Sequence, residues 1–227
     1  MDTLLDLSDR LYLDVADFAH STPHWFQWGA EVWTEAGLLL FGVLFLAVWW
    51  RSREGSSRMM ALALLAPLAT AFGYVVSEAL KSLVDEDRPC RALLGAPASL
   101  VTCPPHGDWS FPSNHSAIAG AAAVALALSW RGIVWLTVPM ALLMAFSRVF
   151  VGVHYPHDVT VGLLVGALVA FVVMRAAARP MGALVETARS SRNPAVAWCA
   201  GRGPSAHAPA HASPYAEDAP RSRHGAY

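Results

Sequence analysis

Long apolar segments separated by short polar ones set the pattern of this chain after residue 29. Five of them, over about 30–50, 59–83, 113–130, 132–151 and 156–178, are each long enough to cross a bilayer as a helix. Pro67 lies inside the second segment, where we expect a kink. Residues 2–20 instead mix leucines with acidic residues, a pattern typical of an amphipathic helix at a membrane surface. The pattern predicts an all-α, polytopic membrane bundle of five transmembrane helices with an N-terminal interfacial amphipathic helix.

The composition agrees with a membrane protein and suggests where its folded part ends. The chain is 55% hydrophobic and only 15% charged, which excludes an ordinary soluble domain. After residue 180 the apolar pattern weakens, and from residue 190 Pro, Ala, Ser, His and Arg follow without periodicity. We therefore predict a membrane-embedded domain over 1–180 and a disordered tail over 181–227, and we expect no nucleic-acid partner.

The basic residues predict how the chain is oriented in a plasma membrane. They gather in the linker after the first segment, in the turn after the third and behind the fifth: Arg51, Arg53, Arg58, Arg131, Arg175, Arg179, Arg189 and Arg192. Because basic loops face the cytoplasm, the tail is expected there, and loop 84–112 and turn 152–155 are expected outside. Cys90 and Cys103 then face an oxidising compartment and can form a disulfide, with two unpaired thiols as the alternative.

Polar side chains gather near the predicted outer ends of the helices. They are Lys81, Arg88, Ser113, Asn114, His115, Ser147, Arg148, His154 and Asp158. Ionisable groups at membrane depth cost several kcal/mol, so we treat them as functional candidates. Ser113 is a natural N-cap, and the helix start behind it suits a phosphate. Glu31 and Glu35 open the first segment and either line this site or lie at the interface.

The chemistry of these side chains fits phosphoryl transfer. Three cations, Lys81, Arg88 and Arg148, can surround the nonbridging oxygens of a phosphoryl group. One histidine can attack phosphorus while another protonates the leaving oxygen. Asp158 lies four residues after His154 and can orient its ring, which favours His154 over the nearby His157 as the nucleophile. His115, at a helix start, suits the acid role; because we find no carboxylate cluster for a metal pair, we predict no metal or cofactor.

The order and spacing of these residues resemble the signature of the type 2 phosphatidic acid phosphatase superfamily. Its parts are matched by Lys81-x6-Arg88-Pro89, Pro112-Ser113-Asn114-His115 and Ser147-Arg148-x5-His154-x3-Asp158. The resemblance implies His154 as nucleophile, Asp158 as its partner and His115 as general acid. It implies these phosphate ligands: Lys81, Arg88, Ser113, Asn114 and Arg148. The family commonly has Gly at position 114, but Asn tolerates unusual backbone angles and keeps the backbone N–H.

The short chain, the acidic first helix and the Phe-Pro-Ser-x-His motif are similar to bacterial undecaprenyl diphosphate phosphatases. That resemblance implies hydrolysis of undecaprenyl or another polyprenyl diphosphate to the monophosphate and phosphate through a phosphohistidine. The reaction would recycle the carrier lipid for cell-wall synthesis, with the site on the extracytoplasmic side. Within the family, the alternative substrate is phosphatidylglycerophosphate or phosphatidate. An anion transporter or membrane scaffold is the alternative from another class, but it predicts polar residues at the middle of the spans.

Overall fold

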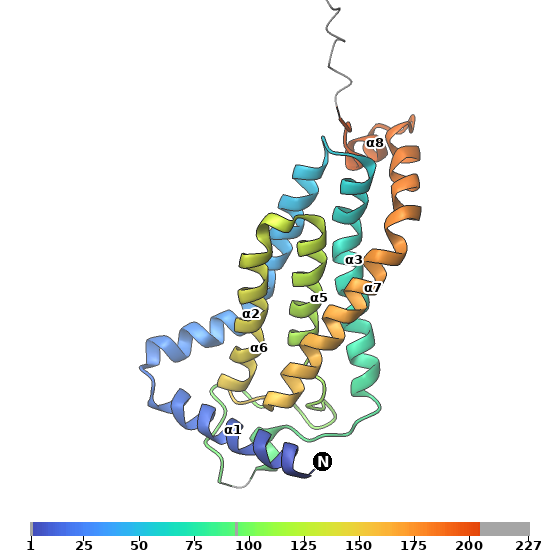
Figure 1. The fold of residues 1–227 in the computed structure, drawn as a ribbon. Helices are drawn as coiled ribbons and strands as arrows, with labels where there is room; N and C mark the ends of the chain where they lie inside the picture. The colour runs from blue at the N-terminus through green and yellow to red at the C-terminus, as the bar shows by residue number, and fades with distance from the viewer. Residues whose placement is uncertain (1, 94, 205–227) are drawn as a thin grey trace, which may run out of the picture.

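The computed structural model describes residues 2–93 and 95–204, and all regular structure within these ranges is helical (Figure 1). The elements are α1 (Asp2–Ser21), α2 (His24–Ser52), α3 (Ser57–Lys81), α4 (Pro89–Ala92), α5 (Asn114–Ser129), the 3₁₀ helix η1 (Arg131–Ile133), α6 (Val134–Phe150), α7 (Pro156–Arg189) and α8 (Pro194–Ala200). The predicted all-α fold is therefore confirmed for the described part of the chain.

Four helical segments within this part are long and apolar enough to cross a membrane. They are α2, α3, the combined η1–α6 segment Arg131–Phe150 and α7. The predicted third span corresponds to α5, which is apolar but has only 16 residues. At 1.5 Å per residue it is about 24 Å long, shorter than the roughly 30 Å hydrocarbon core of a bilayer. A multi-pass membrane bundle is thus supported, whereas the count of five spans stays a prediction.

Helix α5 lies at the centre of the bundle because it is built from small residues that pack on every side. The alanines that it buries are Ala117, Ala119, Ala121, Ala122, Ala123 and Ala125. Glycines let its backbone touch that of α7 directly. A methyl group at Gly166 would overlap the carbonyl oxygen of Ala117, and one at Gly120 would overlap that of Leu163. This close approach fixes the start of α5 beside the start of α7.

Helix α1 lies across the end of the bundle at which α5 and α7 begin (Figure 1). Its inner face buries Tyr12 and Ala16 against Val149 and Tyr155, and the Tyr12 hydroxyl donates to the carbonyl of Gly152 at 3.2 Å. These large apolar side chains of α1 are exposed: Leu5, Leu7, Leu11 and Phe18. This amphipathic pattern supports the predicted interfacial position, which stays a prediction.

The loop between α3 and α5 runs under the same end of the bundle. A disulfide joins Cys90 and Cys103, whose Cα atoms lie 6.2 Å apart. The loop also binds to the turn after α6, because Leu100 N–H donates to the carbonyl of Val151 at 3.0 Å. These links hold the loop against the bundle between Arg88 and Ser113.

The structure corrects the prediction that regular structure ends at residue 180. Helix α7 continues through Pro180 to Arg189, and α8 packs back against it. Met181 and Val185 extend the apolar face of α7 onto the first turns of α3, so tertiary packing keeps this segment helical. Arg189 adds hydrogen bonds to the carbonyl oxygens of Gly55 at 2.9 Å and Ala200 at 3.0 Å. The rest of the predicted tail, residues 205–227, lies outside the described residues.

Candidate active site

The polar residues predicted from the sequence converge where α5 and α7 begin. Lys81 ends α3, Arg88 precedes α4, Ser113 precedes α5, Arg148 lies in the last turn of α6, and Asp158 lies in the first turn of α7. His154 lies in the turn between α6 and α7, in which Gly152 adopts a φ of +85° that favours glycine. Among these residues, the following are nearly inaccessible: Lys81, Arg88, Ser113, Arg148, His154 and Asp158.

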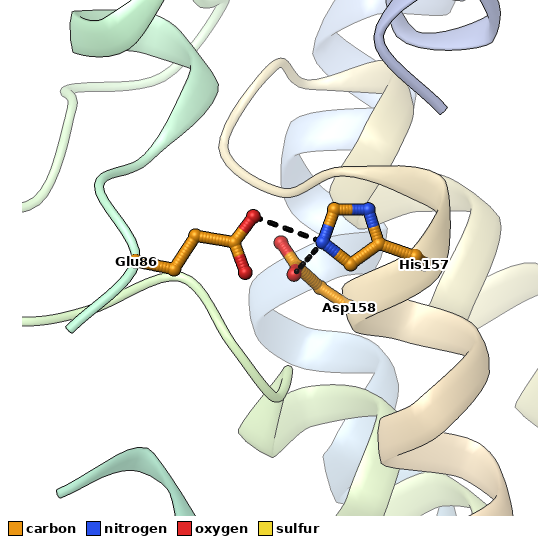
Figure 2. A group of neighbouring side chains, drawn as sticks. All are labelled: Glu86, His157 and Asp158. Atoms are coloured by element: carbon orange, nitrogen blue, oxygen red, sulfur yellow. Dashed lines mark hydrogen bonds and ion pairs between the residues drawn. The ribbon is translucent and has the colours of Figure 1, made fainter. Parts of the chain in front are cut away.

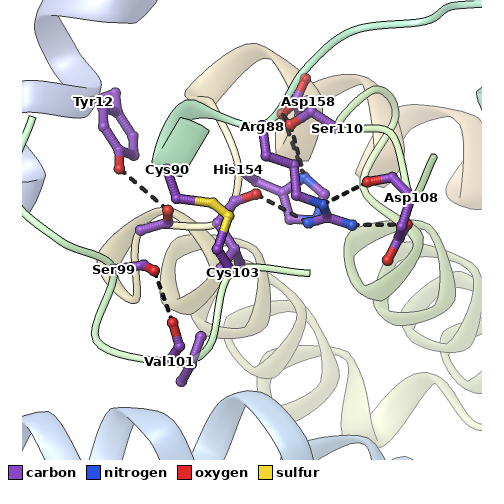
Figure 3. The surroundings of a disulfide bond; sticks show 12 residues. Tyr12, Arg88, Cys90, Ser99, Val101, Cys103, Asp108, Ser110, His154 and Asp158 are labelled. Atoms are coloured by element: carbon purple, nitrogen blue, oxygen red, sulfur yellow. Dashed lines mark hydrogen bonds and ion pairs between the residues drawn. A yellow bond between two sulfur atoms is a disulfide. The ribbon is translucent and has the colours of Figure 1, made fainter. Parts of the chain in front are cut away.

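His154 and Asp158 form a buried, oriented pair. The His154 Nδ1 atom lies 3.3 Å from Asp158 Oδ2, and the same oxygen accepts from the Tyr155 backbone N–H at 2.8 Å and from Ser110 Oγ at 2.5 Å. With its proton on Nδ1, the ring carries a free lone pair on Nε2. The Nε2 atom lies 3.1 Å from Arg88 Nη1 (Figure 3). The ring is therefore positioned to attack through Nε2.

Electrostatics keep this ring neutral. Burial lowers the pKa of His154 to about 4, although the hydrogen bond and charge of Asp158 raise it, and the nearby charges of Arg88 and Arg148 lower it as well. A neutral imidazole keeps a lone pair for attack at neutral pH, as a nucleophile requires.

Lys81 and Arg88 together surround the carboxylate of Asp108. Lys81 Nζ lies 2.8 Å from Asp108 Oδ1. Arg88 Nη2 lies 2.9 Å from the same oxygen, and Arg88 Nε also donates to the Asp108 carbonyl at 2.8 Å (Figure 3). Burial alone raises the pKa of Asp108. The hydrogen bond from Lys81 and the charges of both cations lower this pKa by more, so the net shift is downward. Two cations that converge on one anionic oxygen form the kind of pocket that binds a phosphate.

Arg148 is held by α2, a helix outside the sequence motifs. Its Nη1 donates to the hydroxyl of Thr34 at 2.8 Å and lies 3.6 Å from Glu35 Oε1. Thr34 is completely buried and lies 3.2 Å from the hydroxyl of Ser147. Arg148 Nε is buried and has no hydrogen-bond partner among the described residues. One side of the guanidinium is thus anchored while a donor stays open.

The second motif lies against the first turn of α7. The Ser113 backbone N–H donates to the carbonyl of Asp158 at 3.2 Å, which links the two helix starts. His115 is half-buried in the first turn of α5, within electrostatic range of Arg148 and His154. The side chain of Asn114 bonds instead to α3, accepting from Ser77 Oγ at 2.8 Å and donating to Glu78. Asn114 thus ties α5 to α3, and any contact with a phosphate would use its backbone.

His157 has partners of its own and lies on the other side of Asp158. Its Nε2 is 2.9 Å from Glu86 Oε1 and 3.2 Å from Asp158 Oδ1 (Figure 2). Its Nδ1 is 2.8 Å from the hydroxyl of Ser8 in α1. The ligand atoms of Glu86, His157 and Asp158 lie within 4.8 Å of one another, as a metal centre would require. His157 Nε2 is hydrogen-bonded to Glu86 Oε1, whereas Asp158 Oδ1 is buried and has no hydrogen-bond partner among the described residues. These contacts favour His154 as the nucleophile.

Sequence reasoning missed three residues of the site. Thr34, Asp108 and Ser110 each contact a predicted site residue directly. Ser110 lies only three residues before Ser113, so its nearness to the second motif was a usable signal. Thr34 and Asp108 have no such signal, because only the tertiary fold brings them to Arg148 and Lys81.

Comparison with known proteins places this geometry in a family. The PAP2 superfamily model matches residues 61–181, the region that carries all three motifs. Undecaprenyl-diphosphatase BcrC of Bacillus subtilis is 32% identical over 143 residues, which cover 63% of this chain and 70% of BcrC.

Two solved structures share the fold. The crystal structure of Aquifex aeolicus LpxE superposes with a TM-score of 0.59 at 22% identity, over 73% of this chain and 93% of LpxE. The crystal structure of a PAP2-type phosphatidylglycerolphosphate phosphatase from Bacillus subtilis superposes with a TM-score of 0.55 at 20% identity. The match covers 76% of this chain and 85% of that phosphatase. The family match, the identity to BcrC and the shared fold lead to one conclusion: this chain belongs to the PAP2 superfamily of membrane phosphatases.

Proposed function

We propose that this chain hydrolyses undecaprenyl diphosphate, or a closely similar polyprenyl diphosphate, to the monophosphate and inorganic phosphate. The observation that carries the proposal is the pairing of His154 with Asp158 beside Arg88, at the place where the family motifs converge. The choice of substrate is supported by the similarity to undecaprenyl-diphosphatase BcrC. The solved phosphatidylglycerolphosphate phosphatase shares the fold at 20% identity, which does not favour a glycerolipid for this chain.

In the proposed first step, the terminal phosphoryl group enters the pocket between Lys81, Arg88 and Arg148. It takes the place of the Asp108 carboxylate, which Lys81 and Arg88 now hold. The open Nε donor of Arg148 and the backbone N–H groups after Ser113 supply further contacts to its oxygens. Such donors stabilise the charge on the nonbridging oxygens in the transition state.

His154 Nε2 then attacks the terminal phosphorus, and the bond to the bridging oxygen breaks. Asp158 accepts the Nδ1 proton in a hydrogen bond and stabilises the positive ring of the phosphohistidine. His115 donates a proton to the leaving oxygen, which departs as the lipid monophosphate. In the second step water attacks the phosphohistidine, His115 takes the proton from that water, and inorganic phosphate is released.

We further propose how the protein lies in the membrane. All five apolar helices cross it, α1 lies in the interface, and the site opens to the extracytoplasmic side. The arginines Arg51, Arg53, Arg58 and Arg131 support this orientation, because they lie where α2 ends, where α3 begins and in η1. Figure 1 shows the α2–α3 connection at the end of the bundle away from the starts of α5 and α7. The disulfide between Cys90 and Cys103 supports it independently, since such bonds persist in oxidising compartments. The polyprenyl chain then stays in the bilayer while the diphosphate enters the site.

Phosphate release by the purified protein tests the proposal. We compare undecaprenyl diphosphate, phosphatidate and phosphatidylglycerophosphate with EDTA present, and we expect release mainly from the first. His154→Ala should abolish release, whereas His106→Ala, which changes an exposed histidine of the same loop region, should keep it. A preference for a glycerolipid would contradict the proposed substrate. No release from any of the three would contradict the enzyme itself, and loss of activity in EDTA would contradict the metal-free mechanism.

A further inference from the structure

A second polar hollow lies at the end of the bundle opposite to the active site. It has a volume of about 850 Å³ and opens between the start of α3, the turn after α5 and the later part of α7. The start of α3 is about 36 Å from Lys81, since its 25 residues each rise about 1.5 Å. The hollow is therefore separate from the phosphatase site.

Four arginines from three elements line this hollow. They are Arg58 of α3, Arg131 of η1, and Arg175 and Arg179 of α7, and all four are exposed. Glu186 is the acidic residue in the lining. No ion pair joins any of the four to a residue within 2–93 or 95–204. The hollow thus holds four arginines against one glutamate, an excess of positive charge.

Other arginines at the same end of the bundle have internal partners. The guanidinium of Arg51 lies 4.7 Å from the ring centre of Trp130, and that of Arg53 lies 4.2 Å from that of Trp198. Arg189 is hydrogen-bonded to backbone carbonyls of Gly55 and Ala200. Within the hollow, Arg175 also lies 5.9 Å from the ring centre of Phe171, whereas Arg58, Arg131 and Arg179 make no such contact within the described residues.

The rest of the lining is apolar. Leu62, Leu128 and Met174 line the hollow together with several alanines. A cationic rim over an apolar floor suits a ligand that joins a phosphate to hydrocarbon, whereas a free phosphate ion would leave the floor exposed to water. Basic pockets between transmembrane helices can bind the head groups of anionic lipids.

We propose that this hollow binds the head group of an anionic phospholipid, with its acyl chains along α3 and α7. Such a lipid contacts α3, α5 and α7 at one end, and the same three helices carry Lys81, His115 and Asp158 at the other. Binding to the folded state alone stabilises that state by mass action. The lipid therefore acts as a clamp on the three helices that position the active site.

The test measures lipid binding and needs no turnover. Purified protein in neutral detergent receives dioleoylphosphatidylglycerol, dioleoylphosphatidylcholine or inorganic phosphate at equal concentration, and its Tm and the number of bound lipids by native mass spectrometry are recorded. Phosphatidylglycerol should raise Tm, and the other two should leave it nearly unchanged. The pair Arg131→Gln and Arg179→Gln should weaken phosphatidylglycerol binding about 25-fold, since each basic side chain near an anionic lipid contributes a factor of about five.

The matched control is the pair Arg51→Gln and Arg53→Gln, which removes the same charge from the same end and should keep the lipid-dependent rise in Tm. The pair Arg131→Lys and Arg179→Lys retains the charge and should keep most of the lipid-dependent rise in Tm. This result would show that the loss in the Gln pair comes from the missing charge and not from a folding defect. Equal shifts with phosphatidylglycerol and phosphatidylcholine would overturn the proposal. An equal loss of phosphatidylglycerol binding in the Arg51 and Arg53 control would also overturn it. So would a Tm shift with inorganic phosphate as large as that with phosphatidylglycerol.

Discussion

The hydroxyl oxygen of Thr34 in α2 lies 2.8 Å from Nη1 of Arg148 in α6 and accepts its hydrogen bond. Both side chains are buried, so Arg148 depends on this contact and on Glu35 for its position. Residue 34 lies outside the matched family region of 61–181, yet it touches a predicted phosphate ligand. The first apolar helix therefore does more than anchor the protein, because it orients part of the site.

Replacing Thr34 by Val keeps the shape of the side chain and removes the hydroxyl. A hydrogen bond to a charged group is worth roughly 1.5–3 kcal/mol, so we expect kcat/KM to fall between about 10-fold and 150-fold. Steady-state phosphate release measures it, and Thr34→Ser should restore most of the activity. Thr137→Val is the matched control, because Thr137 is equally buried and, within the described residues, its hydroxyl bonds only to Val134 of its own helix. Equal losses in both Val variants would contradict the role of Thr34.

The contact between α5 and α7 gives a prediction about folding. Gly166→Ala places a methyl group against the backbone carbonyl of Ala117, which neither helix can relieve by a side-chain rotation. We expect a loss of about 1–3 kcal/mol in stability and a clear drop in Tm. Gly182→Ala in the same helix is the control, since nothing lies within 4 Å of its added methyl group. An unchanged Tm for Gly166→Ala would contradict the direct backbone contact.

The disulfide predicts sensitivity to reductant. Cys90 follows Arg88 by two residues, so opening the bond to Cys103 frees the segment that holds this cation. Reduction or the Cys90→Ser, Cys103→Ser pair should cost roughly 3 kcal/mol in stability and lower phosphatase activity. Cys199→Ser, which changes an exposed free thiol, should alter neither. If reductant still lowers the activity of the double Ser variant, the effect does not come from this disulfide.

The lowered pKa of His154 predicts a pH dependence of stability. The unfolded ring binds its proton below about pH 6.5, whereas burial lowers the pKa of the folded ring to about 4. Between these values the unfolded state binds more protons, so this residue makes stability fall as the pH falls from about 6.5 to about 4. His154→Asn should flatten that part of the Tm profile. A profile that matches that of the wild-type protein would show that His154 does not titrate in this way.

Much of the site could be predicted from sequence because its charged residues interrupt apolar segments. Lys81, Arg148 and Asp158 stand out at helix ends, where an ionisable group next to a membrane span has few structural reasons to occur. Thr34 could not be found, because a threonine in an apolar helix has no local signal and only packing brings it to Arg148. The helical segment after Pro180 was missed for the same reason, since its order comes from contacts between Val185 and Met60 on α3.

The most direct test of the account is whether His154 becomes phosphorylated during turnover. Wild-type protein is mixed with undecaprenyl diphosphate labelled at the terminal phosphate, quenched under denaturing alkaline conditions within a single turnover, and digested for peptide mapping. We expect label on the peptide that contains His154, stable in base and lost in acid, and none on that peptide in the His154→Asn variant. Phosphate release by the wild-type protein with no label on His154 at any time would contradict the proposed mechanism.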